Sequence, residues 1–426
     1  GWPLHVETAQ ARQGDAFTEA CKGAKCRACS HRGLKPVLDL GKMPLADRLP
    51  PVGSTELEPR YPLELAFCPN CSLVQILTTV APEVVFDADY PYFSSYSETW
   101  LAHSRSHAIS LIQERGLNSQ SLVIELASND GYLLRTFVEH GVPVLGIDPA
   151  PGPARAAQER GVRTMCAFFT LELAEQLRAE GTLADVVIGK NVLAHVADTN
   201  GFVEGISRIL KPGGVAVVEM PYVRDLIEHT EFDTIYHEHL CYFSITSARK
   251  LFANHGLELV GAERLLLHGG SLRLTFQAGA KMPASVRAML EEEERAGVLA
   301  EEFYSDFAGR ARTVAEGLRE LVLERRRQGR SVASYGAAAK GAVMLNYAGL
   351  DHSVIDFVVD RNPHKQGRMM PGLRIPILPP SALLEQRPDD TIILPWNIKD
   401  EIMAQQQEYR SRGGRFIIPI PSPAVV

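Results

Sequence analysis

From residue 121 onward, short runs rich in Val and Ile alternate with amphipathic helical segments, and this alternation constrains the fold more than any other feature. The strand-like runs are SLVIEL, VPVLGID, ADVVIG and GVAVVEM, and the helical patterns among them are LLRTFVEHG, PARAAQERG and FVEGISRIL. Apolar strands that alternate with helices are typical of a parallel sheet covered by helices. The pattern therefore predicts an α/β domain over residues 91–280.

A second pattern of the same kind occupies the C-terminal part of the chain. The runs SVASYG, IDFVVD, IPILPP, TIILPW and RFIIPIP accompany a helix expected over residues 337–345. They predict a Rossmann-like domain, which a polar helical connector joins to the first domain, both within residues 281–426. Residues 1–24 show no clear periodicity, and we expect them to form a disordered tail.

The charge balance narrows the class of function. The 426 residues contain 44 Lys and Arg against 51 Asp and Glu, a net charge of −7. A chain without a global basic field is not drawn to nucleic acid or to anionic membrane. No run approaches the roughly 18 apolar residues that span a bilayer, and the N-terminus lacks a basic region followed by an apolar one. We expect a cytoplasmic monomer that acts on a small molecule.

Four of the seven cysteines form two Cys-x-x-Cys pairs, Cys26/Cys29 and Cys68/Cys71. Each pair can bind a tetrahedral metal through two thiolates, and in a reducing cytoplasm such a cluster indicates metal ligation. The alternatives are ordinary core cysteines or a redox pair. Because four thiolates leave no coordination position open for water, the pattern predicts a structural zinc, within a zinc-binding module over residues 25–90.

A tight turn follows the first strand of the first α/β domain. The segment from Glu125 to Gly131 leads from strand to helix, which is where α/β sheets bind cofactors. It lacks the G-x-G-x-x-G spacing, so a cofactor without phosphates is favoured. The next strand ends in Asp148, which can accept both ribose hydroxyls or can simply cap a helix. Phe168 and Phe169 can stack on an adenine ring or belong to the core.

Several motifs in this sequence resemble those of known enzyme families. The string ELASNDGYLL from Glu125, the acid at Asp148, KNVLAHV from Lys190 and LKPGG from Leu210 resemble a class I S-adenosylmethionine-dependent methyltransferase. The four cysteines with CPNCSLVQ, the signature YHEHLCYFS over residues 236–244, HGGSLR from His268 and the C-terminal SYGAAAKG resemble the nucleotide-sugar C-methyltransferases of bacterial deoxysugar and antibiotic biosynthesis. The resemblance covers about residues 25–420.

The resemblance implies an α/β fold with a class I methyltransferase (Rossmann-like) core, a small N-terminal zinc module and a C-terminal Rossmann-like domain. It also implies S-adenosylmethionine and structural Zn(II) as cofactors, and a nucleotide-sugar substrate. The residues expected to contact S-adenosylmethionine are Glu125, Ala127, Asn129, Gly131, Leu133, Asp148, Pro149, Phe168, Phe169 and Asn191.

Methylation at carbon requires a base, because a C–H carbon has no lone pair. A 4-keto group on the sugar acidifies the adjacent proton, and removing that proton gives an enolate. The resemblance places the base at His239, with Tyr236 and Glu238 against the substrate or enolate and His195 near the keto oxygen. Tyr90 is the candidate for a further active-site tyrosine, and His195 and Tyr90 remain alternatives for the base. The expected acceptor is C3 of a thymidine-diphosphate 4-keto-deoxysugar.

The remaining candidates are expected to bind substrate. The glycines of His268-Gly269-Gly270 permit close backbone approach to a ligand, although a plain hairpin turn has the same sequence. Lys340 lies in a second turn from strand to helix, where it can bind a nucleotide phosphate. The full substrate-binding set comprises Tyr92, Tyr96, His237, Tyr242, His268, Gly269, Gly270 and Lys340.

Three other functions compete with this one. A methyltransferase of the same fold can act on a different acceptor. A zinc-dependent nucleic-acid-binding protein with an inactive methyltransferase fold is disfavoured by the net charge of −7. An oxidoreductase that uses the C-terminal domain is weakened because G-x-G-x-x-G is missing at Gly336.

Overall fold

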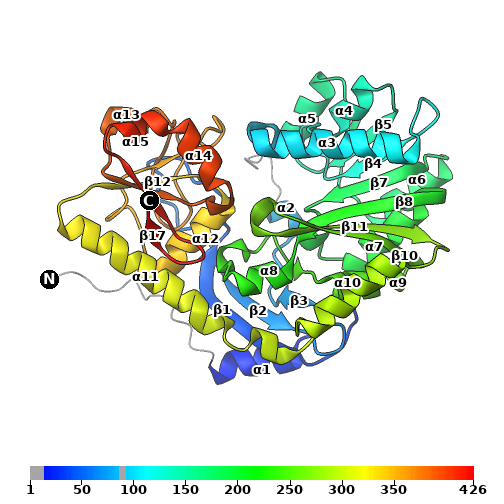
Figure 1. The fold of residues 1–426 in the computed structure, drawn as a ribbon, viewed down its shortest axis with the longest axis horizontal. Helices are drawn as coiled ribbons and strands as arrows, with labels where there is room; N and C mark the ends of the chain where they lie inside the picture. The colour runs from blue at the N-terminus through cyan, green and yellow to red at the C-terminus, as the bar shows by residue number, and fades with distance from the viewer. Residues whose placement is uncertain (1–13, 86–92) are drawn as a thin grey trace.

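Three β-sheets organise the computed structural model, which describes residues 14–85 and 93–426. Figure 1 shows a four-stranded sheet at the lower middle of the view, with a seven-stranded unit on one side and a six-stranded unit on the other. Most of the buried apolar side chains form one continuous cluster that runs from Phe17 to Ile420. The three units therefore share a core. Among the described residues, no helix is both long and apolar enough to span a membrane.

The four-stranded sheet carries the cysteine pairs. Its antiparallel strands lie in the order β1 (Lys35–Pro44), β2 (Arg60–Phe67), β3 (Val74–Ile76) and β9 (Cys241–Tyr242). The last strand comes from a distant part of the chain, since Tyr242 pairs with Val74 and Cys241 with Gln75. Part of the YHEHLCYFS signature is thus an edge strand of the zinc module.

The expectation of a disordered tail over residues 1–24 is wrong for its second half. Residues 15–23 form helix α1 (Asp15–Gly23), which packs on β1 and buries Phe17 and Cys21. The amphipathic pattern of this helix was too short to recognise without the sheet that covers it. Residues 1–13 lie outside the described part of the chain.

The seven-stranded sheet has the order β10-β11-β8-β7-β4-β5-β6. The predicted parallel arrangement holds for six strands, whereas β11 runs antiparallel to both of its neighbours. The strands are β4 (Val123–Leu126), β5 (Val144–Asp148), β6 (Thr164–Cys166), β7 (Ala184–Lys190), β8 (Leu210–Pro221), β10 (Leu257–Leu265) and β11 (Ser271–Ala278).

Helices cover both faces of this sheet (Figure 1). They begin after strand ends rich in turn residues, and several have the expected caps: Ser97, Thr170 and Asp198 each accept a backbone N–H in the first turn. The α-helices are α2 (Pro82–Val85), α3 (Glu98–Arg115), α4 (Leu134–Glu139), α5 (Pro151–Glu159), α6 (Leu171–Ala179), α7 (Thr199–Arg208), α8 (Val223–Glu228) and α9 (Ile245–Ala253). The 3-10 turns are η1 (Ser94–Tyr96), η2 (Leu193–His195), η3 (Phe232–Thr234) and η4 (Leu267–Gly269).

The polar connector predicted after residue 280 is helical. It consists of α10 (Ala284–Arg295), η5 (Glu301–Tyr304) and α11 (Phe307–Arg327). The apolar side chains of α11 recur at helical spacing and are buried, whereas Arg312, Glu316, Glu320 and Glu324 are exposed. At the end of α11, Arg325 forms a two-bond ion pair with the buried Asp390 of the last domain. The connector is therefore packed against the domain that follows it.

The C-terminal unit is a six-stranded sheet in the order β14-β13-β12-β15-β16-β17, parallel except for β17. Its strands are β12 (Val332–Tyr335), β13 (Val358–Val359), β14 (Ile377–Leu378), β15 (Asp390–Ile393), β16 (Arg415–Ile418) and β17 (Ala424–Val425). Its helices are α12 (Ala339–Ala348), α13 (Ala382–Gln386), η6 (Trp396–Ile398), α14 (Lys399–Gln405) and α15 (Gln407–Ser411).

Candidate functional site

The four cysteine sulfurs converge on one point. Cys26 Sγ lies 3.6 Å from Cys71 Sγ, Cys29 Sγ lies 3.6 Å from Cys68 Sγ, and all four lie within 4.8 Å of one another. Four thiolates at about 2.3 Å from a tetrahedral zinc would stand about 3.8 Å apart. The sulfurs are therefore placed as a zinc ion requires.

Two amide side chains complete the surroundings of these sulfurs. Gln75 Nε2 donates to Cys26 Sγ at 3.3 Å, and Asn70 Nδ2 donates to Cys29 Sγ at 3.4 Å. Such donors stabilise thiolate charge and orient the ligands. Gln75 lies on β3 directly opposite Cys241 of β9. Gln75 thus links the cysteine cluster to β9, the strand formed by Cys241 and Tyr242 of the YHEHLCYFS signature.

Two predicted catalytic histidines lie together. His195 ends η2, just after β7, and His239 lies before β9, with the ring centroids 4.6 Å apart in an edge-to-face arrangement. The ring of Tyr236 lies 4.0 Å from that of His239 on another side. His239 is buried, whereas His195 and Tyr236 are half-buried. Residues from two distant segments thus form one cluster at the carboxyl edge of the parallel strands.

Hydrogen bonding determines the tautomer of His239. Its Nδ1 lies 3.1 Å from the carbonyl oxygen of Thr234, which can only accept. Nδ1 therefore carries the proton, and Nε2 keeps a lone pair. Burial, aided by the neighbouring His195, lowers the pKa of His239 well below 6.5. Burial lowers the pKa of His195 to about 4. Both rings are neutral near pH 7 and can accept a proton.

His237 and Glu238, which lie between Tyr236 and His239 in the signature, point elsewhere. His237 Nε2 contacts the backbone carbonyl oxygens of Tyr61 and Pro62 on β2, at 3.2 and 3.0 Å. Glu238 is buried beside Asp47 of the zinc module, and burial, followed by the charge of Asp47, raises its pKa to about 8. His237 and Glu238 thus face the zinc module, whereas Tyr236 packs on His239, which faces His195.

The tyrosine candidates differ in position. Tyr242 is buried in β9, with its ring 6.3 Å from that of His239, and its hydroxyl has no hydrogen-bond partner in the described part of the chain. Tyr96 ends the 3-10 turn η1. Tyr90 and Tyr92 lie outside the described residues.

The predicted cofactor loop forms a tight turn at the end of β4. Ala127 and Asn129 have φ values of 57° and 51°, which bring the backbone back on itself. The carboxylate of Asp148, at the end of β5, accepts the backbone N–H groups of Asn129 and Ala150, both at 2.8 Å. Burial raises the pKa of Asp148 to about 6. Asp148 thus orders the loop, and its oxygens retain lone pairs for further donors.

The other cofactor candidates divide into exposed and packed groups. Phe168 is 37% exposed, whereas Phe169 packs on Phe202 with ring centroids 5.3 Å apart. Phe169 is therefore packed against a core residue, and stacking of Phe168 on an adenine ring stays a prediction. Leu133 is fully buried in the core under α3, so its side chain packs rather than faces the loop. Pro149 and Asn191 are half-buried, and Asn191 has a φ of 55°.

The segment His268-Gly269-Gly270 meets the C-terminal domain. Gly269 and Gly270 have φ values of 83° and 120°, and a Cβ atom on Gly269 would collide with Trp396 and Glu231. Only glycine permits this approach. Lys340 Nζ donates to Asn397 Oδ1 at 2.8 Å and lies 4.6 Å from the centre of the Trp396 ring.

Two acidic residues that the sequence analysis did not single out, Glu231 and Asp233, face the contact between residues 268–270 and the C-terminal domain. Trp396 Nε1 donates to Asp233 Oδ2 at 2.7 Å. The carboxyl groups of Asp233 and Glu231 both favour the charged form of the half-buried Lys340, whose pKa is nevertheless lowered by desolvation. Burial raises the pKa of Asp233 to about 6 and that of Glu231 to about 9. The position of these two acids within six residues of the signature could have drawn attention to them. Their neighbours Lys340 and Trp396, however, lie more than 100 residues later in the chain.

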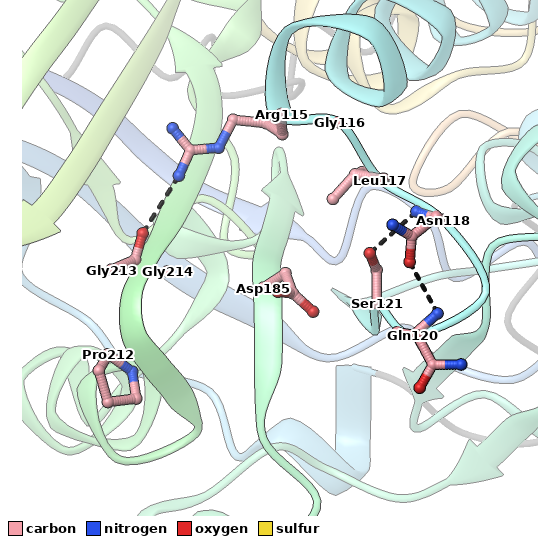
Figure 2. Close-up of a pocket in the computed structure, with 10 residues that line it drawn as sticks. All are labelled: Arg115, Gly116, Leu117, Asn118, Gln120, Ser121, Asp185, Pro212, Gly213 and Gly214. Atoms are coloured by element: carbon pink, nitrogen blue, oxygen red, sulfur yellow. Dashed lines mark hydrogen bonds between the residues drawn. The ribbon is translucent and has the colours of Figure 1, made fainter.

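A polar pocket of about 310 Å³ lies away from all these groups (Figure 2). Arg115, Asp185 and Gly213 are among its lining residues, and Arg115 donates to the Gly213 carbonyl at 3.1 Å. Asp185 and Gly213 stand near the amino ends of β7 and β8. Because ligands of open α/β sheets bind at the carboxyl ends of the strands, we assign this pocket no part in the chemistry.

Comparisons with known proteins agree with these three units. Family models match a zinc binding domain at residues 26–86, a methyltransferase domain at residues 100–262 and a C-methyltransferase C-terminal domain at residues 266–421. C-methyltransferase NovU from Streptomyces niveus is 37% identical over 409 residues, which cover 94% of this chain and 96% of that protein.

Other similarities are partial. A ubiquinone biosynthesis O-methyltransferase from Azorhizobium caulinodans is 31% identical over 25% of this chain and 46% of its own length. Among solved structures, magnesium protoporphyrin IX methyltransferase from Synechocystis PCC 6803, with bound SAM, has 15% identity and a TM-score of 0.33. The alignment covers 42% of this chain and 79% of that structure. A score this low has no bearing on function.

Proposed function

The chain belongs to the family of S-adenosylmethionine-dependent C-methyltransferases that includes C-methyltransferase NovU, and from this premise we propose that it methylates C3 of a thymidine-diphosphate 4-keto-deoxysugar on the way to an antibiotic sugar. The zinc held by the four cysteines is structural, because thiolates occupy all four of its coordination positions. The acceptor must then meet the histidine cluster rather than the metal.

Carbon methylation sets two requirements that this chain's residues can meet. A base must take the proton from the carbon beside the keto group, and donors must stabilise the negative charge that moves onto the keto oxygen. S-adenosylmethionine, when bound, supplies the electrophilic methyl group. The remaining steps depend on the protein.

His239 is the proposed base. Its Nε2 lone pair takes the proton while the C–H electrons form the enolate, and the bond from Nδ1 to the Thr234 carbonyl keeps the ring in the required tautomer. The positive charge that develops on His239 is stabilised by that same carbonyl. His195 and Tyr236, which flank the ring, are proposed to contact the keto oxygen and the sugar. Tyr90 remains a proposed additional active-site residue.

Two residues of the signature that pack against the zinc module are proposed to act without contacting the substrate. His237 and Glu238 face the zinc module, and we propose that they position Tyr236 and His239 instead of contacting the sugar.

The nucleotide and the cofactor are proposed to lie in different places around the histidine cluster. Lys340, Gly269 and Gly270 line the approach from the C-terminal domain, where we propose that the nucleotide lies. The cofactor is proposed to lie along the 125–131 loop, with its ribose at Asp148.

The observation that carries this proposal is the pair of neutral, adjacent histidines at the carboxyl edge of the sheet. Its test is to incubate the enzyme with S-adenosylmethionine and a thymidine-diphosphate 4-keto-2,6-dideoxysugar. The proposal predicts a product heavier by one CH₂ unit, with the new methyl on carbon by NMR. The corresponding 4-hydroxy sugar nucleotide, whose C3 proton is not acidified, should remain unmethylated. A methyl group on oxygen, or no methylation of any 4-keto sugar nucleotide, would reject the proposal.

A further inference from the structure

Residues 93–99, which lead into helix α3, contact the C-terminal unit. The ring of Phe93 stacks on that of His364, with the ring centroids 4.3 Å apart and the ring planes inclined by only 12°. Beside this pair, Glu98 Oε1 lies 3.7 Å from Arg361 Nη2. An aromatic pair and an ion pair thus join a segment of the methyltransferase domain to the loop that follows β13.

A hydrogen bond extends this contact along α3. The hydroxyl of Thr99 donates to the carboxylate of Glu401 on α14. Figure 1 shows the beginning of α3 directed toward α14. An exposed ion pair contributes little to stability, and a stacked aromatic pair contributes more. The contact is therefore a modest one, and the stacked rings are its main part.

The same segment is bonded to the predicted cofactor loop. The backbone N–H of Ser94 donates to Asn129 Oδ1 at 2.9 Å, and the backbone N–H of Ser95 donates to Asp130 Oδ2 at 3.1 Å. Asn129 has a φ of 51°, a conformation that costs energy in any residue other than glycine and persists only where its surroundings hold it. Residues 93–99 therefore supply two of the bonds that hold this loop in shape.

The loop on the C-terminal side of the contact is itself well fixed. Arg361 and His364 follow Asp360, whose carboxylate accepts the backbone N–H groups of Ala337 and Asn362, both at 2.8 Å. Asn362 Oδ1 accepts the backbone N–H of His364 at 2.9 Å. Side chains that bond to nearby backbone in this way stabilise one loop conformation. His364 thus offers Phe93 a fixed surface on which to pack.

The contact joins the edges at which the two domains are expected to bind ligands. The loop at residues 361–364 follows the carboxyl end of β13, and the loop at residues 127–131 follows the carboxyl end of β4. Ligands of α/β sheets bind at such ends. Residues 93–99 therefore connect a loop at the ligand-binding edge of one sheet with a loop at the ligand-binding edge of the other.

We propose that Arg361 and His364 are positioning residues for the methyl donor: by holding residues 93–99, the C-terminal domain keeps the cofactor loop of the other domain in its binding shape. Neither side chain contacts the cofactor in this account. The inference rests on the proposed placement of the cofactor along residues 125–131, and it makes no use of the acceptor sugar.

An exchange of charges in the full-length, zinc-loaded protein tests the ion pair. Arg361→Glu and Glu98→Arg each place two like charges opposite one another, and each should weaken S-adenosylhomocysteine about 2–5-fold by calorimetry, the scale of an exposed charge pair. The double variant restores the pair with its polarity reversed and should recover wild-type affinity. Arg412→Glu makes the same change of charge at an arginine whose partner, Glu408, lies in its own domain, and it should have no effect.

A second pair of variants tests the stacked rings. His364→Ala removes the ring and should weaken S-adenosylhomocysteine about 2–10-fold, as expected for the loss of an aromatic pair. His364→Phe keeps a ring against Phe93 and should bind as wild type. Losses that neither His364→Phe nor the double charge variant recovers would overturn the inference, because they would arise from general damage to the fold.

Hydrogen exchange of the ligand-free protein locates the effect. The amides of Ser94, Ser95 and the 127–131 loop should exchange faster in Arg361→Glu and in His364→Ala than in wild type. Unchanged exchange and affinity in these variants, or a change in one without the other, would overturn the inference. If bound S-adenosylhomocysteine protects none of residues 127–131 in the wild type, the cofactor placement is wrong, and the inference falls with it.

Discussion

The backbone N–H of Leu240 donates to the carbonyl oxygen of Ala194 at 2.6 Å, which ties the segment that carries His239 to the segment that carries His195. The two histidines are 44 residues apart in the chain, yet each immediately neighbours this bond. Their approach is therefore fixed by the backbone and does not depend on either ring. Substitution of one imidazole should leave the position of the other intact.

His239→Asn should lower turnover about 10²–10⁴-fold, the usual contribution of a positioned base. Asparagine retains a side-chain donor for the Thr234 carbonyl but has no group that titrates as a base. Affinity for S-adenosylhomocysteine should remain at the wild-type value, because the proposed cofactor contacts lie on other loops. Steady-state kinetics and calorimetry on the same preparation check this. Turnover within about threefold of wild type would remove His239 from the mechanism.

The dependence of the rate on pH follows from burial of the two histidines. A base acts only when unprotonated, and a pKa held below 6.5 means that His239 and His195 stay unprotonated as the pH falls to about 6.5. We therefore expect kcat to remain level between about pH 8 and 6.5 and to fall only in more acidic solution. A kcat profile with a half-maximal point near pH 7 would contradict this.

Loss of the zinc should lower activity, although the metal lies in the zinc module and not at the histidine cluster. Cys68→Ser should bring bound zinc from about one equivalent per chain to well below half, because three thiolates no longer complete the tetrahedron. Activity should fall with it, since β9 pairs with β3 and His237 bonds to β2. Elemental analysis and turnover measure the two effects. The control is Cys166→Ser, which changes an exposed cysteine outside the cluster. Full activity in zinc-free protein would show that the module does not support the site.

Glu231 should make the protein less stable in alkaline solution. Its pKa is raised from 4.5 to about 9, so the folded protein keeps a proton that the unfolded chain has lost. Stability from this group is present below about pH 4.5 and decreases as the pH rises toward 9, by about 1.4 kcal/mol per pH unit. Glu231→Gln should remove this slope from the free energy of unfolding measured by denaturant between about pH 6 and 8. Glu291→Gln, at an exposed position of α10, serves as the control. Parallel slopes for wild type and Glu231→Gln would contradict the expectation.

The sequence was sufficient for features that depend on local periodicity. Strands β4, β5, β7 and β8 coincide with the Val-rich and Ile-rich runs, because each is buried on both faces and needs no polar alternation. The cysteine spacing likewise predicted the cluster, since each Cys-x-x-Cys turn brings its two sulfurs together without help from the rest of the fold.

Features that depend on distant contacts were not predictable. The direction of His237 is set by carbonyl groups of β2, about 175 residues earlier, so the spacing of the signature cannot distinguish it from His239. Lys190 lay within a recognised motif, but its contacts with Glu219 of β8 and with the Trp100 ring of α3 come from segments that the motif does not include. The antiparallel direction of β11 depends on the turn at Gly269 and Gly270, where a Cβ atom would collide with Trp396 at the first glycine and with Asp225 at the second.

Exchange of the substrate's C3 proton with solvent deuterium tests the central claim most directly, because it observes proton removal without methyl transfer. With S-adenosylhomocysteine in place of the methyl donor, the wild-type enzyme should exchange the C3 proton of the 4-keto sugar nucleotide, as NMR in deuterium oxide would record. His239→Asn should exchange it about 10²–10⁴-fold more slowly while binding S-adenosylhomocysteine normally. Exchange by His239→Asn at the wild-type rate would contradict the account and move the base to His195 or Tyr90.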